Sequence, residues 1–156
     1  MRIEKCFIDN LDSADKSHIG SYGTKFKKSF ILKVIDEKEN LTTIAICSVL
    51  NNEELNNELD ILAENFKLYS EENNNNEYDE WKNTFLEKLK DCVYLEYIES
   101  IKKGVGGAKF LIEYIKNNYN KFWLYSAFEA EEYWSEKIKL RGSEEYFYST
   151  ETIYIN

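Results

Sequence analysis

The stretch "DCVYLEYIESIKKGVGGAKFLIEYI", residues 91–115, places strand-like, glycine-rich and helical sequence in one continuous run. Apolar and aromatic residues crowd positions 93–98, which predicts a short β-strand. Three of the chain's six glycines follow at positions 104–107, and apolar residues at helical spacing then predict a helix from about 106 to 119. A strand, a loop and a helix in this order are typical of an α/β domain.

The glycine loop has the properties of an anion-binding turn. A helix leaves its first amide hydrogens unpaired and carries partial positive charge at that end. Glycine lets the backbone approach a ligand closely, and Lys102, Lys103 and Lys109 add positive charge in a chain whose net charge is -9. The sequence therefore predicts a phosphate group held at the start of this helix, although a plain tight turn would use the same glycines.

Two common nucleotide-binding patterns do not fit the loop. A Walker loop requires G-x-x-x-x-G-K-[ST], and this spacing is missing from the sequence. The dinucleotide fingerprint G-x-G-x-x-G starts correctly at Gly104 and Gly106, but Lys109 and Phe110 stand where its third glycine belongs. The phosphate is therefore expected to belong to another kind of ligand.

The remaining segments alternate between strand and helix patterns. A polar, asparagine-rich tract at 70–78 is expected to be a mobile loop. Ser126 and Glu129 form a capping-box pattern that would open a helix ending at Gly142. Strands are predicted at 5–8, 30–35, 43–50, 122–125 and within 144–155, and further helices at 53–69 and 79–90.

Composition excludes several classes of protein. The net charge of -9 argues against binding along a nucleic-acid backbone, and no apolar run reaches the roughly 20 residues needed to cross a bilayer. The charged N-terminal segment is not expected to be a signal peptide, so a cytoplasmic location is the default. Three scattered cysteines and the lone His18 argue against a metal site.

The segment 92–140 resembles the GNAT N-acetyltransferase superfamily. Members typically carry a strand, a loop of the form [Q/R]-x-x-G-x-[G/A] and a helix whose amides bind the coenzyme A pyrophosphate; residues 103–108, "KGVGGA", match with lysine in first place. Downstream, Ala130 and Tyr133 fit a second family motif. The resemblance implies a single α/β (α+β) domain over 1–156, with a mixed central sheet flanked by helices and a helical elaboration at 53–90.

The resemblance also implies an acetyl-CoA-dependent N-acyltransferase without a metal. An amine would attack the thioester directly, and strand 93–101 would splay from 121–126 to admit the pantetheine arm. Backbone amides of the strand would polarise the thioester carbonyl. The residues expected to contact the coenzyme are Ile98, Lys103, Gly104, Val105, Gly106, Gly107, Ala108 and Lys109.

Proton transfer is where the sequence departs from the family. Trp134 occupies the position of the usual general-acid tyrosine, and Ala127 replaces a frequent asparagine. Tyr133 is therefore the nearest candidate to protonate the departing thiolate. Glu96 or Glu99 could accept the proton of the attacking amine, with Glu96 favoured. In a regular strand the two carboxylates would point to opposite faces, and either also fits a solvated position at a strand edge.

The acceptor and the partners stay open at this point. The acidic composition favours a cationic amine, which could belong to a polyamine, an aminoglycoside or a protein. No nucleic-acid or membrane partner is expected, and a homodimer is compatible with the resemblance. The alternative is a catalytically degenerate module of the same fold, which would dock a basic protein or mimic nucleic acid.

Overall fold

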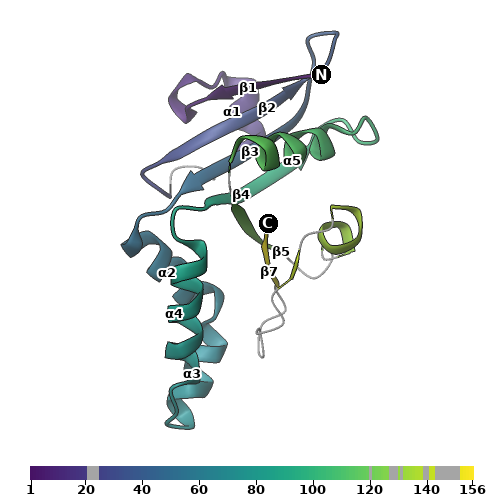
Figure 1. Cartoon of the computed structure of the whole chain (residues 1–156). Coiled ribbons are helices and arrows are strands. Elements are labelled where there is room, and N and C mark those ends of the chain that lie inside the picture. Colours follow the sequence, from purple (N-terminus) through teal and green to yellow (C-terminus); the bar gives the residue numbers. More distant parts are fainter. Residues whose placement is uncertain (21–24, 120, 127–129, 131, 139–140, 143–151) are drawn as a thin grey trace. The chain divides into compact units, whose positions relative to one another are not determined.

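The computed structural model describes residues 1–20, 25–119, 121–126, 130, 132–138, 141–142 and 152–156 (Figure 1). The chain is a mixture of strands and helices, as the sequence predicts. It divides into two compact units, of which unit 1 comprises 1–49 and 93–122 and unit 2 comprises 50–92 and 123–156. Within the described ranges, no helix combines the length and the apolar character needed to cross a membrane.

Unit 1 is built on an antiparallel sheet in the order β1-β2-β3-β4. Its strands are β1 (Arg2–Cys6), β2 (Ser29–Ile35), β3 (Leu41–Val49) and β4 (Val93–Ser100). The predicted hairpin of β2 and β3 and the predicted strand β4 are confirmed, whereas the first strand lies earlier than the predicted 5–8.

The two faces of this sheet carry different helices because successive side chains of a strand point to opposite sides. Ile31 faces the short helices η1 (Ile8–Asn10) and α1 (Ser13–Ile19), where it packs with Leu11, Ile19, Ile44 and Ile46. Its neighbour Phe30 stacks on Tyr119 at the end of α5 (Gly107–Asn118), with ring centroids 5.7 Å apart. Figure 1 shows α5 lying across the sheet of unit 1.

Helix α5 matches its prediction and has a clear amphipathic origin. Leu111, Ile112 and Ile115 recur at helical spacing and are fully buried. Burial of each such side chain contributes about 1.5–3 kcal/mol relative to exposure, which is what holds the helix to its place in unit 1. The helix therefore presents a fixed N-terminus directly after β4 and the glycine loop.

Unit 2 contains the helices α2 (Asn52–Leu62), α3 (Glu64–Glu72) and α4 (Glu77–Leu89). An aromatic cluster of Phe66, Tyr78, Trp81 and Phe85 joins α3 to α4, with ring centroids 4.9–5.9 Å apart. In the same unit, β7 (Thr152–Ile155) pairs antiparallel with β5 (Phe122–Ser126) and with β6 (Arg141–Gly142). Strand β5 belongs to unit 2 from Trp123 on.

The structure corrects several predicted boundaries in unit 2. The single helix predicted at 53–69 is two helices, because Ala63 leaves the helical conformation with φ -113° and ψ 28°. The predicted loop at 70–78 shortens to 73–76, since α3 continues to Glu72 and α4 starts at Glu77.

Around the downstream motif, the structure describes a short π-helix, η3 (Tyr133–Lys137), and Gly142 lies in β6 instead of ending a helix. Glu129 of the predicted capping box lies outside the described residues.

Candidate functional site

The glycine loop owes two of its glycines to backbone conformation. Gly104 and Gly106 have φ angles of 78° and 79°, in the left-handed region that side-chain-bearing residues rarely adopt. A β-carbon built on either residue would meet nothing within 4 Å, so these positions face open space. The loop from Lys102 to Gly106 is exposed, which leaves its backbone accessible to a ligand.

Gly107 has a different role, which is to seat α5 against β3. A β-carbon at this position would lie 2.3 Å from Oγ1 of Thr43 and 2.8 Å from Oγ1 of Thr42. The amides of Ile101 and Lys102 both donate to the Thr42 carbonyl, at 2.9 and 3.1 Å. The start of the helix is therefore fixed to the first residues of β3 by backbone contacts and by close packing.

The first turn of α5 is available to an anion. No side chain of the described residues caps its N-terminus, and the turn contains no acidic residue. Lys103 and Lys109 are exposed on either side of the turn. Uncapped amides, the helix dipole and nearby ammonium groups all favour a phosphate at this point. The residues predicted to cradle a phosphate are thus brought together and can fit one.

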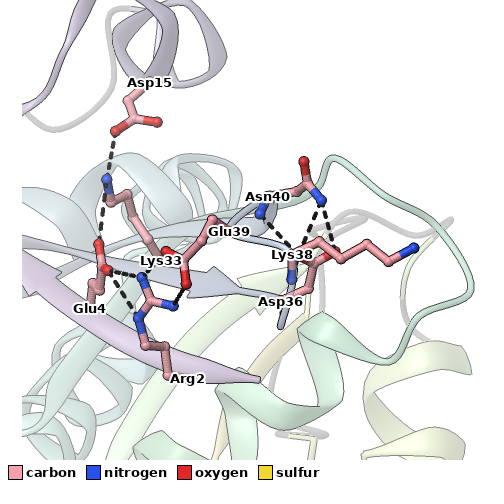
Figure 2. A network of polar contacts seen from close by, with 8 residues as sticks. All are labelled: Arg2, Glu4, Asp15, Lys33, Asp36, Lys38, Glu39 and Asn40. Atoms are coloured by element: carbon pink, nitrogen blue, oxygen red, sulfur yellow. Dashed lines mark hydrogen bonds and ion pairs between the residues drawn. The ribbon is translucent and has the colours of Figure 1, made fainter.

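A hollow of about 320 Å³ lies beside the loop, lined by Met1, Asp36, Glu37, Lys38, Thr42, Lys102 and Val105. Asp36 opens the β2–β3 turn and accepts hydrogen bonds from the amides of Asn40 and Lys38, as Figure 2 shows. These hydrogen bonds, of which the one from the Asn40 amide contributes most, lower the pKa of Asp36 to about 2. The carboxylate is therefore charged at neutral pH and lies 3.4 Å from Nζ of Lys102. Lys102 is consequently less available to a ligand than Lys103 and Lys109.

Glu96 occupies a β-bulge in β4. Tyr97 lies opposite Ile46 and Leu95 lies opposite Cys47, so Glu96 is an extra residue between two paired positions. The bulge breaks the strict alternation, so counting residues no longer fixes its face relative to Glu99. One carboxylate oxygen of Glu96 is buried although the residue as a whole is half-exposed. Bulges often redirect a side chain next to an active site, which keeps Glu96 as a candidate.

Glu99 lies on the face of the sheet that α1 covers, next to two groups that sequence reasoning did not select. Its Oε2 is 3.6 Å from Nδ1 of His18 and 3.3 Å from the hydroxyl of Tyr97. The same hydroxyl is 3.2 Å from the His18 carbonyl oxygen. His18 and Glu99 are 81 positions apart in the sequence, so no local motif could predict that they meet. The single histidine of the chain was the one feature that could have drawn attention to this cluster.

The remaining predicted site residues divide between the units. Ile98 is a half-buried residue of β4 opposite Ala45 in unit 1. Tyr133 belongs to unit 2, where its ring packs edge-to-face on Trp134 with centroids 5.0 Å apart, and burial raises the pKa of Tyr133. Its role as proton donor stays a prediction. Ala127 lies outside the described residues.

Comparison with known proteins adds no further assignment. A scan against models of known protein families finds no match, and a search of curated proteins finds no similar sequence. In the part of the chain that the structure describes, no three His, Cys, Asp or Glu side chains gather in a way that could hold a metal ion.

Proposed function

We propose that this chain is an acetyl-CoA-dependent N-acetyltransferase of the GNAT type, acting on an amine. The observation that carries the proposal is the exposed, uncapped start of α5, which two left-handed glycines place directly after β4 between Lys103 and Lys109. This is the arrangement that the family motif requires of residues 103–108. The antiparallel hairpin before β4 supports the same proposal.

The glycine loop, its lysines and the backbone of β4 have defined tasks under this proposal. The amides of Val105 to Ala108 would hold the pyrophosphate, with Lys103 and Lys109 as counter-charges. Bound acetyl-CoA would supply an acetyl group already activated as a thioester. The backbone of β4 around Ile98 would face the thioester end, since β4 leads back from the loop by about 3.3 Å per residue. Glu96 and Glu99 lie along this path, roughly 17 and 7 Å from Ile101.

Calorimetric titration with coenzyme A tests the binding step. Wild-type protein is expected to bind, and Gly106→Val is expected to abolish binding because a β-branched residue cannot keep the left-handed conformation without strain. Gly20→Val is the matched control, since Gly20 also lies in unit 1 with positive φ (56°) and open space around it, but follows α1 instead of preceding α5. Lys103→Glu should weaken binding by about tenfold through charge reversal. No binding at millimolar coenzyme A would overturn the proposal.

A second candidate function is a coenzyme-binding module without transferase activity. It is favoured by Trp134, which is only 6% exposed and whose indole cannot protonate a thiolate at neutral pH. An acetyl-CoA consumption assay with polyamines, aminoglycosides and lysine peptides separates the two candidates. Turnover with any of these amines supports the transferase, and coenzyme binding without turnover on any of them supports the module.

A further inference from the structure

The cluster formed by His18, Tyr97 and Glu99 links the last turn of α1 to β4. The imidazole Nδ1 and the Glu99 carboxylate are 3.6 Å apart, close enough for an ion pair when the imidazole is protonated. The single hydroxyl proton of Tyr97 can go either to the His18 carbonyl, at 3.2 Å, or to Glu99, at 3.3 Å. The cluster therefore combines a base, a carboxylate that can stabilise its protonated form, and a hydroxyl that contacts either the carboxylate or the backbone of the base.

The cluster is also accessible. The side chains of His18 and Glu99 are 32% and 37% exposed, so a water molecule or an amine can reach them. Tyr97 packs against buried Ile19, Ile44 and Ile46, so one side of the cluster is apolar. A carboxylate beside an imidazole is a common way to orient the ring and to stabilise its protonated form.

We propose that His18 is the proton acceptor for the attacking amine, and that Glu99 acts as a positioning residue for it. This inference rests on the proposed acetyltransferase function and refines it, because Glu99 would work through the imidazole and not as the base itself. Glu96, in the bulge three residues earlier, is then left with a structural or substrate-contacting role.

The proton and electron balance of the step is complete without a further reactant. The acceptor arrives as an alkylammonium, whose pKa is near ~10.4, and gives one proton to the imidazole. Its nitrogen lone pair then forms the bond to the acetyl carbon while the bond from that carbon to sulfur breaks. The C–S bonding pair stays on sulfur, which leaves as a thiolate and takes up the second proton lost by the nitrogen through water, and the imidazolium returns its own proton to water.

Other charged groups on this face are already engaged. Lys33 of β2 lies 2.8 Å from Asp15 of α1 and 3.8 Å from Glu4 of β1, as drawn in Figure 2. Besides these, Lys16 shares the last turn of α1 with His18 and is exposed, Cys6 of β1 packs against the same apolar residues as Tyr97, and β3 contributes isoleucines. Within the described residues, Glu99 is the carboxylate that pairs with His18.

The first test needs no activity. Because the chain has one histidine, protein labelled with ¹⁵N-histidine gives a single imidazole spin system. Glu99→Gln is expected to move the Nδ1 and Cε1–H signals, whereas Glu87→Gln, an exposed glutamate on α4, is expected to leave them in place. Unchanged signals in Glu99→Gln would mean that the pair does not form in solution, and the inference would fail whatever the chain catalyses.

The second test is the pH dependence of acetyl transfer. His18→Gln should lower kcat about 10²-fold or more near pH 7, and the deficit should shrink towards pH 10 because the amine then loses its proton unaided. Glu99→Gln should show a smaller deficit of the same kind, and Glu87→Gln none. Calorimetry should show unchanged binding of coenzyme A in His18→Gln and in Glu99→Gln.

Tyr97→Phe separates chemistry from simple attachment of α1. It removes the hydroxyl that contacts His18 and Glu99 but keeps both titrating groups, so any loss it causes should be the same at pH 7 and pH 10. A deficit in His18→Gln that is equally flat with pH, or full activity in that variant, would overturn the inference while the acetyltransferase function stands. Wild-type protein that binds coenzyme A and acetylates no amine would remove the function, and the inference with it.

Discussion

The three glycines of the loop show how one residue type can serve different physical needs. The sequence predicts them together, as residues that let a ligand approach the backbone. In the structure, Gly104 and Gly106 supply left-handed conformations in open space, while Gly107 supplies a close contact with Thr43. The position of the turn was predictable from composition, but the contact with Thr43 depends on a residue 64 positions away and was not.

Gly107→Ala is expected to lower the free energy of unfolding by about 1–3 kcal/mol, because its methyl group would overlap the Thr43 hydroxyl. Urea unfolding followed by far-UV circular dichroism measures the change, because the three tryptophans all lie in unit 2. Thr43→Ala in the same chain should recover part of the loss, since it removes the closer of the two conflicting hydroxyls and leaves Oγ1 of Thr42 at 2.8 Å.

Gly104→Ala serves as the control for this effect. It should cost roughly 1 kcal/mol from backbone strain alone, and Thr43→Ala should not relieve that cost. An unchanged stability in Gly107→Ala would show that the helix does not start against β3 as described.

At the level of elements, the existence of most strands and helices was predictable and their ends were not. The break at Ala63 has no glycine or proline to announce it, and the apolar spacing of Leu55, Leu59, Leu62 and Phe66 continues across it. Tertiary packing decides it, because Phe66 must meet Tyr78 and Trp81 on α4.

The loop predicted at the asparagine-rich tract was too long for a local structural reason. The Ser70 hydroxyl donates a hydrogen bond to the Asn75 carbonyl at 2.9 Å and accepts one from the Tyr78 amide at 3.3 Å. These bonds fold the tract into a short connection between two helices. Side-chain bonds of this kind compete with the regular backbone pattern and are invisible to composition. The β-bulge at Glu96 could not be predicted either, because no glycine marks its position in the sequence.

Asp60 joins α2 to the other helices of unit 2. Burial alone would raise its pKa, but hydrogen bonds from Lys82, at 2.6 Å, and from the Tyr78 hydroxyl lower the pKa overall. A lowered carboxyl pKa stabilises the folded state above the usual aspartate range and loses that contribution as the pH falls through the lowered value. We therefore expect the unfolding free energy to fall as the pH drops below about 4.

Asp60→Asn should remove this part of the pH dependence and cost roughly 1 kcal/mol at pH 7. Urea unfolding between pH 7 and pH 2.5 measures it. Asp91→Asn is the comparison, because Asp91 is exposed and its positive φ of 60° suits asparagine. Parallel curves for wild type and Asp60→Asn would contradict the expected role of the pair.

For the whole molecule, the sequence does not mark where one unit passes into the other. The passages at 49–50, 92–93 and 122–123 contain no glycine-rich linker, and only the change from strand to helix patterns, predicted at 53–90, coincides with the 50–92 part of unit 2. The arrangement of segments distant in sequence within one unit, as with His18 and Glu99, likewise could not be predicted from local patterns.

The cysteines report on the two units separately. Cys47 is fully buried in unit 1, where burial raises its pKa, and Cys92 is 4% exposed at the end of unit 2's helical segment. Thiol labelling under native conditions should modify half-exposed Cys6 first. Cys92 should follow through local opening after α4, and Cys47 should react last, because it requires opening of the sheet.

Mass spectrometry of digested, labelled protein gives the three rates in one experiment. Serine variants of Cys6 and Cys92 provide controls for peptide assignment. Equal rates for Cys47 and Cys92 across a urea series would mean that the units open as one, contrary to this expectation.

Strand β1 ends the sheet of unit 1, pairing with β2 on one side. Such a border offers backbone groups to which a foreign strand could add, and this is how many proteins begin to form fibrils. Here Arg2 bridges Glu4 and Glu39 at 2.6–2.8 Å, and Lys5 is held over the Phe30 ring at 4.0 Å. A strand from another molecule that paired with β1 would have to desolvate these charged side chains and break their ion pairs. The side chains that stabilise the hairpin therefore also disfavour self-association at this edge.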